Sequence, residues 1–368
     1  MKPVNVPMTA PKIAVIARDI WQRDAVGEFT LFSAERLSNL GFHVQCYAEN
    51  TSEELIGQGA VRLISDLHND INPQDMILFH FSTYDPLFDE LVKLENRICV
   101  YFHNITPPEH FVGWDEVAVK VTGLGYDQIK LLEKVDHIAV NSPYTANVVA
   151  EQGVNVGTMT EIAPSRGMSS WQIEADQDFE YLNTSYLLYV GRLAPNKGIS
   201  EVLNTFAEFK KLDPSIKLII LGVPSTPDYQ IHLMQLLDEL SLNDGSVQFL
   251  SGLDKSKLAD FYRNADAFIT LSTHEGFCVP VAEALFFECP VFSNGLPPID
   301  WICSRARQLS HMSTSSEPVE MAKELHDFMT SMKAITRNPY NGEVAKNIER
   351  LCSPTNYDEW LRRVFPNT

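Results

Sequence analysis

The sequence predicts an α/β fold made of two doubly wound domains, and three observations carry that prediction. Short apolar runs of strand length alternate with helical patterns along all 368 residues. Such alternation is typical of βαβ units, which build parallel sheets. The rhythm breaks once, between residues 164 and 183, where an acidic stretch indicates a linker. A chain of this length also fits two domains of roughly 150 residues each.

The expected elements fall into two groups, one on each side of the linker. Strand candidates are 12–17, 43–48, 61–64, 76–81, 98–103, 137–141, 158–162, 186–191, 216–222, 247–251, 267–272, 290–293 and 308–311. Helical patterns between them include 29–40, 142–151, 199–211, 229–240 and 255–264. We therefore expect an N-terminal domain at 1–165, a linker at 166–183, a C-terminal domain at 184–345 and a tail at 346–368 that contains a short amphipathic helix.

The composition argues against several classes of partner. The formal net charge is −19, and both halves of the chain are acidic. Nucleic acid and anionic membranes are bound through basic faces, so neither is an expected partner and no strong membrane binding is expected. The sequence shows no apolar run of 18 residues and no charged and then apolar leader at its start, so neither a membrane span nor a signal peptide is expected. Six cysteines without a CxxC pair fit a reduced, cytoplasmic protein, and Cys46, Cys99 and Cys289 lie in apolar runs that predict burial.

A pair of glutamates eight positions apart, Glu275 and Glu283, is the most informative motif of the chain. The strand candidate 267–272 precedes it, and Pro280 suits the first turn of a helix. Glu275 is therefore expected on a strand-to-helix loop, and Glu283 about one turn into the helix. The amides of 276–279 would face a bound anion at the positive end of the helix dipole. Such a site suits a polyol attached to a phosphate; two solvated glutamates in an ordinary strand–helix unit are the alternative.

Two cations form a second motif, in which Arg192 and Lys197 lie between Gly191 and Gly198. The strand candidate 186–191 ends before them, and a helical pattern follows. Arginine offers a planar fork and lysine a point charge, which together suit a diphosphate. A loop with two solvated cations is the alternative, but the two motifs support each other because both follow strands of one domain.

Together the two motifs resemble the E-x7-E and G-R-x4-K-G signatures of retaining glycosyltransferases of family 4, the glycosyl transferases group 1. The resemblance covers nearly the whole second domain and patches of the first. It implies a GT-B fold, with two Rossmann-like domains facing across a cleft and a last helix that crosses back to the N-terminal domain. It also implies a donor site made of Gly27, Gly191, Arg192, Lys197, Gly222, Glu275, Gly276, Phe277, Cys278, Val279 and Glu283.

The resemblance gives these residues separate roles. Arg192 and Lys197 would hold the donor diphosphate and stabilise it as it leaves. Glu275 would hold the donor sugar together with the amides that follow it, and Glu283 would accept hydrogen bonds from the ribose. The base would contact backbone near Gly222–Thr226 and Gly252–Leu253.

The N-terminal domain matches the family at fewer positions. His103 ends the strand candidate 98–103 and is followed by Asn104-Ile105-Thr106-Pro107-Pro108, which resembles a subgroup of bacterial polysaccharide enzymes. In the family a histidine at this strand end lies beside the donor sugar, so His103 joins Glu275, Arg192 and Lys197 as a catalytic candidate; a structural histidine is the alternative. The glycine-rich loop of the family is reduced to Gly27, which suits a close backbone approach.

No metal or other cofactor is expected. Asp176 and Asp178 form a D-x-D pattern, but they lie in the acidic linker rather than at a strand end. His80, His103 and His110 lack the spacing of zinc ligands.

The resulting hypothesis is a retaining glycosyltransferase that takes a sugar from a UDP- or GDP-linked donor and passes it to a glycan or glycolipid acceptor, in bacterial surface polysaccharide synthesis. Two alternatives remain: a nucleotide-sugar-binding protein without turnover, and a GT-B enzyme of the sugar-nucleotide epimerase type. The sequence leaves the donor base, the sugar, the acceptor, the linkage and the oligomeric state open.

Overall fold

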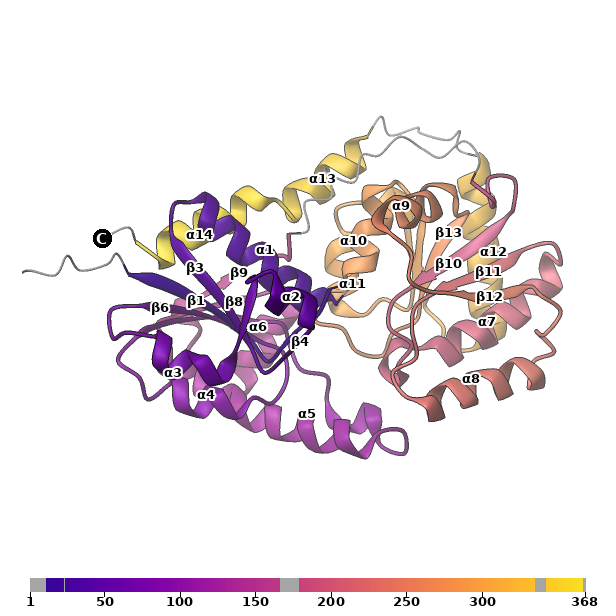
Figure 1. Cartoon of the computed structure of the whole chain (residues 1–368). Coiled ribbons are helices and arrows are strands. Elements are labelled where there is room, and N and C mark those ends of the chain that lie inside the picture. Colours follow the sequence, from indigo (N-terminus) through magenta and orange to yellow (C-terminus); the bar gives the residue numbers. More distant parts are fainter. Residues whose placement is uncertain (1–10, 23, 166–178, 335–341, 367–368) are drawn as a thin grey trace, which may run out of the picture. The chain divides into compact units, whose positions relative to one another are not determined.

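The computed structural model describes residues 11–22, 24–165, 179–334 and 342–366, and Figure 1 labels their helices and strands. The chain divides into two units, each built on its own parallel sheet. The first unit comprises Met1–Ile105, Leu124–Arg166 and Pro354–Thr368, and the second comprises Thr106–Gly123 and Gly167–Ser353. Residues 106–123 and 346–353 thus group with the second unit, whereas the sequence-based boundaries put them elsewhere.

The described part of the first unit forms a sheet in the order β5-β3-β1-β6-β7-β8-β9, with all neighbours parallel. Its strands are β1 Lys12–Ala17, β3 His43–Ala48, β5 Val61–Leu63, β6 Met76–Phe81, β7 Arg97–Phe102, β8 His137–Val140 and β9 Met159–Glu161. A short separate pair joins β2 Asp19–Ile20 to β4 Asn50–Thr51. The central strands are apolar at nearly every position because helices cover both faces of a parallel sheet.

The helices of this unit lie on both faces of the sheet (Figure 1). They are α1 Ala25–Asn39, α2 Glu53–Gly57, α3 Leu67–Asp70, α4 Pro86–Leu91, α5 Glu116–Gln128 (which begins in the second unit), α6 Pro143–Glu151 and α14 Pro354–Val364. Helices α1 and α14 pack on one face, and Phe88 of α4 and Val149 of α6 pack on the other. Side-chain caps start several of them, for example Asp24 at α1 and Ser142 at α6.

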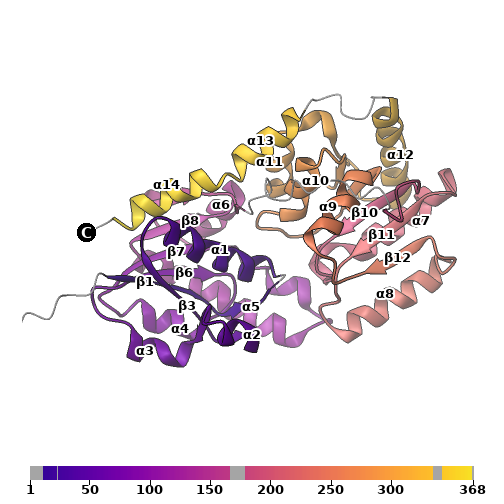
Figure 2. The same ribbon diagram turned by 45° about the horizontal axis from the view of Figure 1, so that its top comes forward.

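Helix α14 is the last described helix and packs beside α1, as Figure 2 shows. Tyr357 donates its hydroxyl proton to Ser33 Oγ at 2.7 Å, and Arg36 forms a bidentate pair with Asp358. Trp360 lies against Tyr101, with ring centroids 6.5 Å apart. The C-terminal helix therefore completes the core of the first unit.

The described part of the second unit forms a parallel sheet in the order β12-β11-β10-β13-β14-β15. Its strands are β10 Tyr186–Val190, β11 Lys217–Leu221, β12 Val247–Leu250, β13 Ala267–Thr270, β14 Val291–Ser293 and β15 Ser310–Met312. Its helices are α7 Ile199–Leu212, α8 Pro227–Glu239, α9 Lys255–Asn264, α10 Val279–Phe286, α11 Pro297–Cys303, α12 Pro318–Ala334 and α13 Glu343–Leu351. Figure 1 shows α7 and α8 on one side of this sheet and α9 and α10 on the other.

The predicted fold class is confirmed, because each unit is a parallel sheet with helices on both faces. Every predicted strand is present, with ends that differ by at most two residues. Cys46, Cys99 and Cys289 are buried as predicted. Of the predicted linker, residues 166–178 lie outside the described residues. Phe179 and Tyr181 are buried and pack on Phe261 of α9, so this end of the linker is part of the second unit.

Two glycines in α5 should respond to alanine in opposite ways. A Cβ at Gly123 would meet nothing within 4 Å, whereas a Cβ at Gly125 would lie 2.8 Å from the Tyr84 backbone nitrogen. Glycine costs a helix about 0.5–1 kcal/mol relative to alanine, so Gly123→Ala should raise the free energy of unfolding by about that amount. Gly125→Ala should lower it. Urea denaturation of both variants checks the pair, and destabilisation by Gly123→Ala would contradict the packing described.

Candidate active site

The order of strands in the second unit reverses next to β10. The chain runs from β10 through β11 to β12 on one side and then continues as β13 on the other side of β10. Open α/β sheets bind ligands at the carboxyl ends of strands where such a reversal occurs. Arg192 lies directly after β10, and Glu275 lies on the loop that follows β13. The structure thus brings both sequence motifs to the same edge of one sheet.

Gly191 and Gly222 follow β10 and β11, and their backbones are in close contact. A Cβ at Gly222 would lie 1.9 Å from the carbonyl oxygen of Gly191, so only glycine permits this approach. The Gly191 amide also donates to Leu221 O at 3.0 Å. Both candidate residues therefore shape the backbone of the edge where a donor would lie.

Lys197 and Glu275, which belong to separate motifs in the sequence, form an ion pair. Lys197 Nζ lies 2.8 Å from Glu275 Oε2, and Ser272 Oγ donates to Glu275 Oε1 at 3.0 Å. The two loops are also joined by backbone, since the Thr273 amide donates to Asn196 O at 2.9 Å. Glu275 is only 8% exposed. A buried carboxylate held on both oxygens has a fixed orientation, which a residue that contacts a reacting sugar needs.

Arg192 differs from Lys197 in being exposed. Within the described residues, no ion pair holds its guanidinium. In this part of the chain, an exposed guanidinium without an ion-pair partner and a half-buried ammonium lie on the same loop, which gives this edge of the sheet positive charge for an anion.

Glu283 lies within α10, as predicted, and its side chain is buried at 3% exposure. Tyr262 of α9 donates its hydroxyl proton to Glu283 Oε2 at 2.9 Å. Burial, together with the nearby Glu283, raises the pKa of Tyr262 well above its usual value, so the phenol stays a donor. Tyr262 stacks on Phe287, with ring centroids 5.8 Å apart. One carboxyl oxygen of the second glutamate is therefore already engaged by the protein.

Removal of that donor should destabilise the second unit. Tyr262→Phe keeps the stacked ring and leaves Glu283 without one partner, and an unsatisfied buried group costs about 1–3 kcal/mol. We expect the free energy of unfolding to fall by that amount in a denaturant titration. Phe287→Leu, which removes the stacked ring and keeps the hydrogen bond, is the comparison. An unchanged Tyr262→Phe protein would mean that the hydrogen bond contributes nothing.

The turn that starts α10 has an unusual backbone. Cys278 caps the helix at φ 76° and ψ 71°, a left-handed conformation that few non-glycine residues adopt. Its side chain is buried, and burial raises the pKa of the thiol well above its usual value, so it is a neutral packing group. Phe277 is buried against Trp301, with ring centroids 6.0 Å apart. The side chains of 277 and 278 thus point inward, and their backbone, with that of Gly276 and Val279, forms the start of α10.

Residues 106–123 supply contacts to the second unit that the sequence analysis missed. His110 Nδ1 lies 3.0 Å from Thr273 Oγ1, and its ring centroid lies 5.7 Å from that of His274. Trp114 packs edge-on against Tyr229 of α8, at 5.2 Å between centroids. The loop that carries Glu275 therefore has His110 as a neighbour. The Pro-Pro pair and the aromatic residues after it were visible in the sequence, but nothing local indicated which unit they join.

His103 lies in the first unit, directly after β7, as predicted. Its Nε2 lies 3.0 Å from His80 Nδ1, and Asn141 Nδ2 donates to its carbonyl oxygen at 2.9 Å. Burial lowers the pKa of His103 to about 3, so the imidazole is neutral at physiological pH. A neutral imidazole can donate or accept one hydrogen bond at its remaining nitrogen.

Gly27 lies in the first turn of α1. A Cβ at this position would lie 2.5 Å from the carbonyl oxygen and 2.6 Å from the nitrogen of Trp21. The backbone of Gly27 therefore lies close to that of Trp21, whereas the approach to a bound donor stays a prediction. The contact with Trp21 alone requires glycine here.

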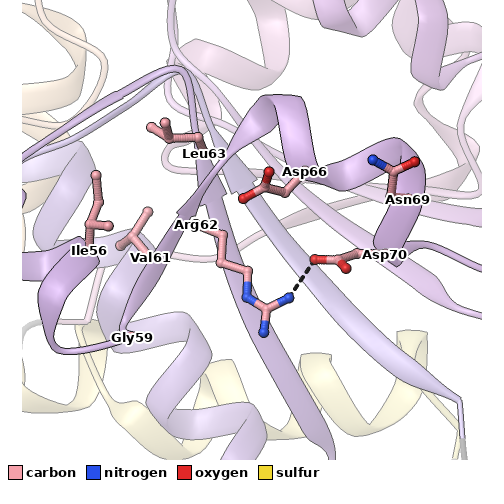
Figure 3. Close-up of a pocket in the computed structure, with 8 residues that line it drawn as sticks. All are labelled: Ile56, Gly59, Val61, Arg62, Leu63, Asp66, Asn69 and Asp70. Carbon is pink, nitrogen blue, oxygen red and sulfur yellow. Dashed lines mark hydrogen bonds and ion pairs between the residues drawn. The ribbon is translucent and has the colours of Figure 1, made fainter.

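A separate hollow of about 350 Å³ lies at the β5 edge of the first sheet (Figure 3). Arg62 pairs there with Asp70 at 2.6 Å, which lowers the pKa of that carboxyl. None of the predicted site residues lines this hollow, so it contributes nothing to the arrangement above.

Two features are absent from the described residues. No group of histidine, cysteine, aspartate or glutamate side chains in this part of the chain is arranged to hold a metal ion. Asp176 and Asp178 lie outside the described residues. None of the described helices combines the length and the apolar character that crossing a membrane requires.

Comparisons with known proteins identify part of the chain. Residues 172–306 match the family model of the glycosyl transferases group 1. A GDP-mannose:cellobiosyl-diphosphopolyprenol alpha-mannosyltransferase from Xanthomonas oryzae is 30% identical over 125 residues, 33% of this chain and 32% of the relative. A D-inositol 3-phosphate glycosyltransferase from Frankia alni is 27% identical over 210 residues, 55% of this chain and 49% of the relative. The chain thus spans about a third to a half of the length of these two curated relatives.

Solved structures resemble the whole chain. Anabaena HepE, in a complex with UDP-glucose, has a TM-score of 0.74 at 15% identity and covers 97% of this chain and all of its own. WaaG, a glycosyltransferase involved in lipopolysaccharide biosynthesis, has a TM-score of 0.70 at 12% identity and covers 96% of this chain. At such identities the likeness shows the fold alone. Residues 172–306 are therefore similar to the glycosyl transferases group 1 family, within a chain that has the GT-B fold.

Proposed function

We propose that this protein is a retaining, metal-independent glycosyltransferase that moves a sugar from a nucleotide-diphosphate donor to a glycan or glycoconjugate acceptor. The observation that carries the proposal is the ion pair between Lys197 and Glu275 at the edge where the strand order reverses. Arg192 stands exposed after the neighbouring strand. Cations for an anionic leaving group and an oriented carboxylate for sugar hydroxyls occur there together, in the segment that matches the family model.

In the proposed reaction the diphosphate is the leaving group. Arg192 and Lys197 neutralise the charge that develops on it, which is commonly the largest catalytic contribution, about 3–4 kcal/mol for a well-placed donor. Glu275 and the backbone of 276–279 hold the donor sugar. Glu283 accepts hydrogen bonds from the ribose. His103 is the fourth residue to which we assign a contact with the sugar, on the family resemblance alone.

The donor is proposed to be linked to UDP or GDP. HepE has been crystallised with UDP-glucose, and the Xanthomonas relative is a GDP-mannose enzyme, so neighbours of this chain use both bases. Several relatives act on lipid-linked or polysaccharide acceptors by name, including an O-antigen chain mannosyltransferase of Salmonella typhimurium. Synthesis of a bacterial surface polysaccharide in the cytoplasm is the process we propose on that basis.

Two other functions remain to be tested against this one. A protein that only binds a nucleotide sugar would retain the donor site without turnover, and an epimerase-type enzyme would change the sugar without an acceptor. Purified protein incubated with UDP- and GDP-sugars separates the three. Transfer, or slow hydrolysis with release of the nucleoside diphosphate, supports the proposal. Binding without release favours the first alternative, and an epimerised product favours the second.

Chelation tests the metal-independent part of the proposal. Because Arg192 and Lys197 supply the positive charge, we expect the rate of transfer to be unchanged in EDTA. The measurement is release of nucleoside diphosphate with and without the chelator. Loss of activity that Mg²⁺ or Mn²⁺ restores would contradict the prediction and would make Asp176 and Asp178 the first residues to mutate.

A further inference from the structure

His80 and His103 form an imidazole pair at the carboxyl ends of β6 and β7 in the first unit. His80 Nδ1 lies 3.0 Å from His103 Nε2, and the ring centroids lie 5.3 Å apart. Backbone fixes their relative position, because β6 and β7 are paired and the His103 amide donates to Phe81 O at 2.8 Å. The contact is therefore set by sheet register rather than by flexible side chains.

The surroundings of His80 are aromatic, and its side chain is buried. His80 is 2% exposed and packs against Phe29 and Tyr101, with ring centroids at 5.6 and 5.7 Å. The Tyr101 hydroxyl is already used, since it donates to Ile162 O at 2.6 Å. Among the described residues, His80 Nε2 is buried and has no hydrogen-bond partner. Burial, and secondarily the neighbouring His103, lowers the pKa of His80 well below its usual value, so both rings are neutral.

Because His80 Nε2 has no partner among the described residues, one arrangement of the protons on the two imidazole rings is favoured. A single proton is shared between His80 Nδ1 and His103 Nε2, so one ring donates and the other accepts. If His103 donated, the proton of His80 would sit on Nε2 as a buried N–H without an acceptor. Orphaned buried N–H groups are rarer than unsatisfied acceptors. The favoured state is the reverse one, in which His80 Nδ1–H donates and His80 Nε2 is a bare acceptor.

We infer that His80 is a positioning residue that holds His103 in the Nδ1–H tautomer, so that the half-buried ring presents a hydrogen-bond donor to a sugar hydroxyl oxygen. His103 Nε2 is occupied by the proton of His80, which places the proton of His103 on Nδ1. His103 keeps part of its surface exposed, whereas His80 does not. The tautomer follows from the first unit alone, but the use of the donor on a sugar rests on the proposed function.

The tautomer is read directly by nitrogen NMR of the full chain labelled with ¹⁵N-histidine, without any ligand. Resonances of His80 and His103 are assigned by their loss in His80→Asn and His103→Asn. We expect a protonated, pyrrole-type Nδ1 and a bare, pyridine-type Nε2 for His103. The opposite pattern would overturn the inference.

Replacement of His80 by asparagine or by glutamine tests where the hydrogen-bond donor must lie. Asparagine places its amide nitrogen near the Nδ1 position of histidine and glutamine near the Nε2 position, so only His80→Asn can still donate to His103. We expect His80→Asn to retain the Nδ1–H tautomer of His103 and a kcat within about 3-fold of the unmodified protein. In His80→Gln we expect His103 to lose this tautomer and kcat to fall by about 10-fold, which corresponds to one hydrogen bond. The KM of the donor and the binding of nucleoside diphosphate should be unchanged in both. Equal effects of the two amides on the tautomer would contradict the inference.

The two readouts also separate this inference from the proposed function. The protein could lack transferase activity while the Nδ1–H tautomer of His103 still depends on a donor at position 80. That result would support the positioning role of His80 and reject the proposed function. Active transferase with His103 protonated on Nε2 would sustain the function and reject the inference. Circular dichroism and thermal melting of each variant verify that it is folded before either comparison is made.

Discussion

Lys197→Ala should lower the rate of sugar transfer by at least ~100-fold, the scale of one missing charge-stabilising group. The lysine is half-buried at the carboxyl edge of the second sheet, where the departing diphosphate needs positive charge. The decrease should appear mainly in kcat, because charge on the leaving group is largest in the transition state. Steady-state kinetics with the purified variant measures it.

A matched control is available within the same region of the chain. Lys210, in the last turn of α7, also pairs with a carboxylate, Asp244, but lies away from the proposed site. Lys210→Ala should leave kcat within about 2-fold, since exposed ion pairs contribute little. A rate near that of the unmodified protein for Lys197→Ala would mean that the diphosphate binds elsewhere.

The ion pair leaves a second explanation for a defect at Lys197, namely disorder of Glu275. A double-mutant cycle with Glu275→Gln distinguishes the two. If Lys197 acts only by holding Glu275, the double variant should be no worse than Glu275→Gln alone. If Lys197 acts on the diphosphate, the double variant should be slower than either single variant. Direct titration with nucleoside diphosphate then shows whether the interaction that Lys197→Ala removes already exists in the ground state.

The strands and both charged motifs could be predicted because each depends on local pattern. Buried parallel strands are continuous apolar runs, and Arg192 and Glu275 lie on the loops that follow two of them. The pairing of Lys197 with Glu275 was not predictable from spacing, because 78 positions separate them and only the strand order makes them neighbours. The signal for it was present in principle, since two expected strands of one domain each ended in a charged loop.

Other features were missed because they join distant segments. Tyr262 reaches Glu283 across two helices, and an isolated tyrosine in a helical pattern is normally a core residue. His110 contacts Thr273 although it precedes the linker, and no local pattern shows that residues 106–123 belong with the second unit. For His80 the sequence alone suggests no role beyond that of a metal ligand, which its spacing disfavours. Its pairing with His103 becomes apparent once β6 and β7 are known to be adjacent.

The two glutamates should differ in the kinetic constant that each controls. Glu275 is proposed to contact the sugar ring, where charge and shape change as the bond breaks, so Glu275→Gln should lower kcat by about 100-fold while nucleoside diphosphate still binds. Glu283 is proposed to contact the ribose, which is the same in the ground and transition states. Glu283→Gln should therefore mainly raise the KM of the donor, by about 10-fold, because removing a hydrogen bond that both states share leaves kcat unchanged.

Glutamine is the appropriate replacement at both positions because the structure requires an acceptor at each. Its carbonyl oxygen can still accept from Ser272 at position 275 and from Tyr262 at position 283, so the folded state retains those hydrogen bonds. A donor that carries deoxyribose should reproduce the Glu283→Gln defect and add little to that variant, since the same hydrogen bond is already absent. An unchanged kcat in Glu275→Gln, or a product whose anomeric configuration is inverted relative to the donor, would reject both the role of Glu275 and the retaining mechanism.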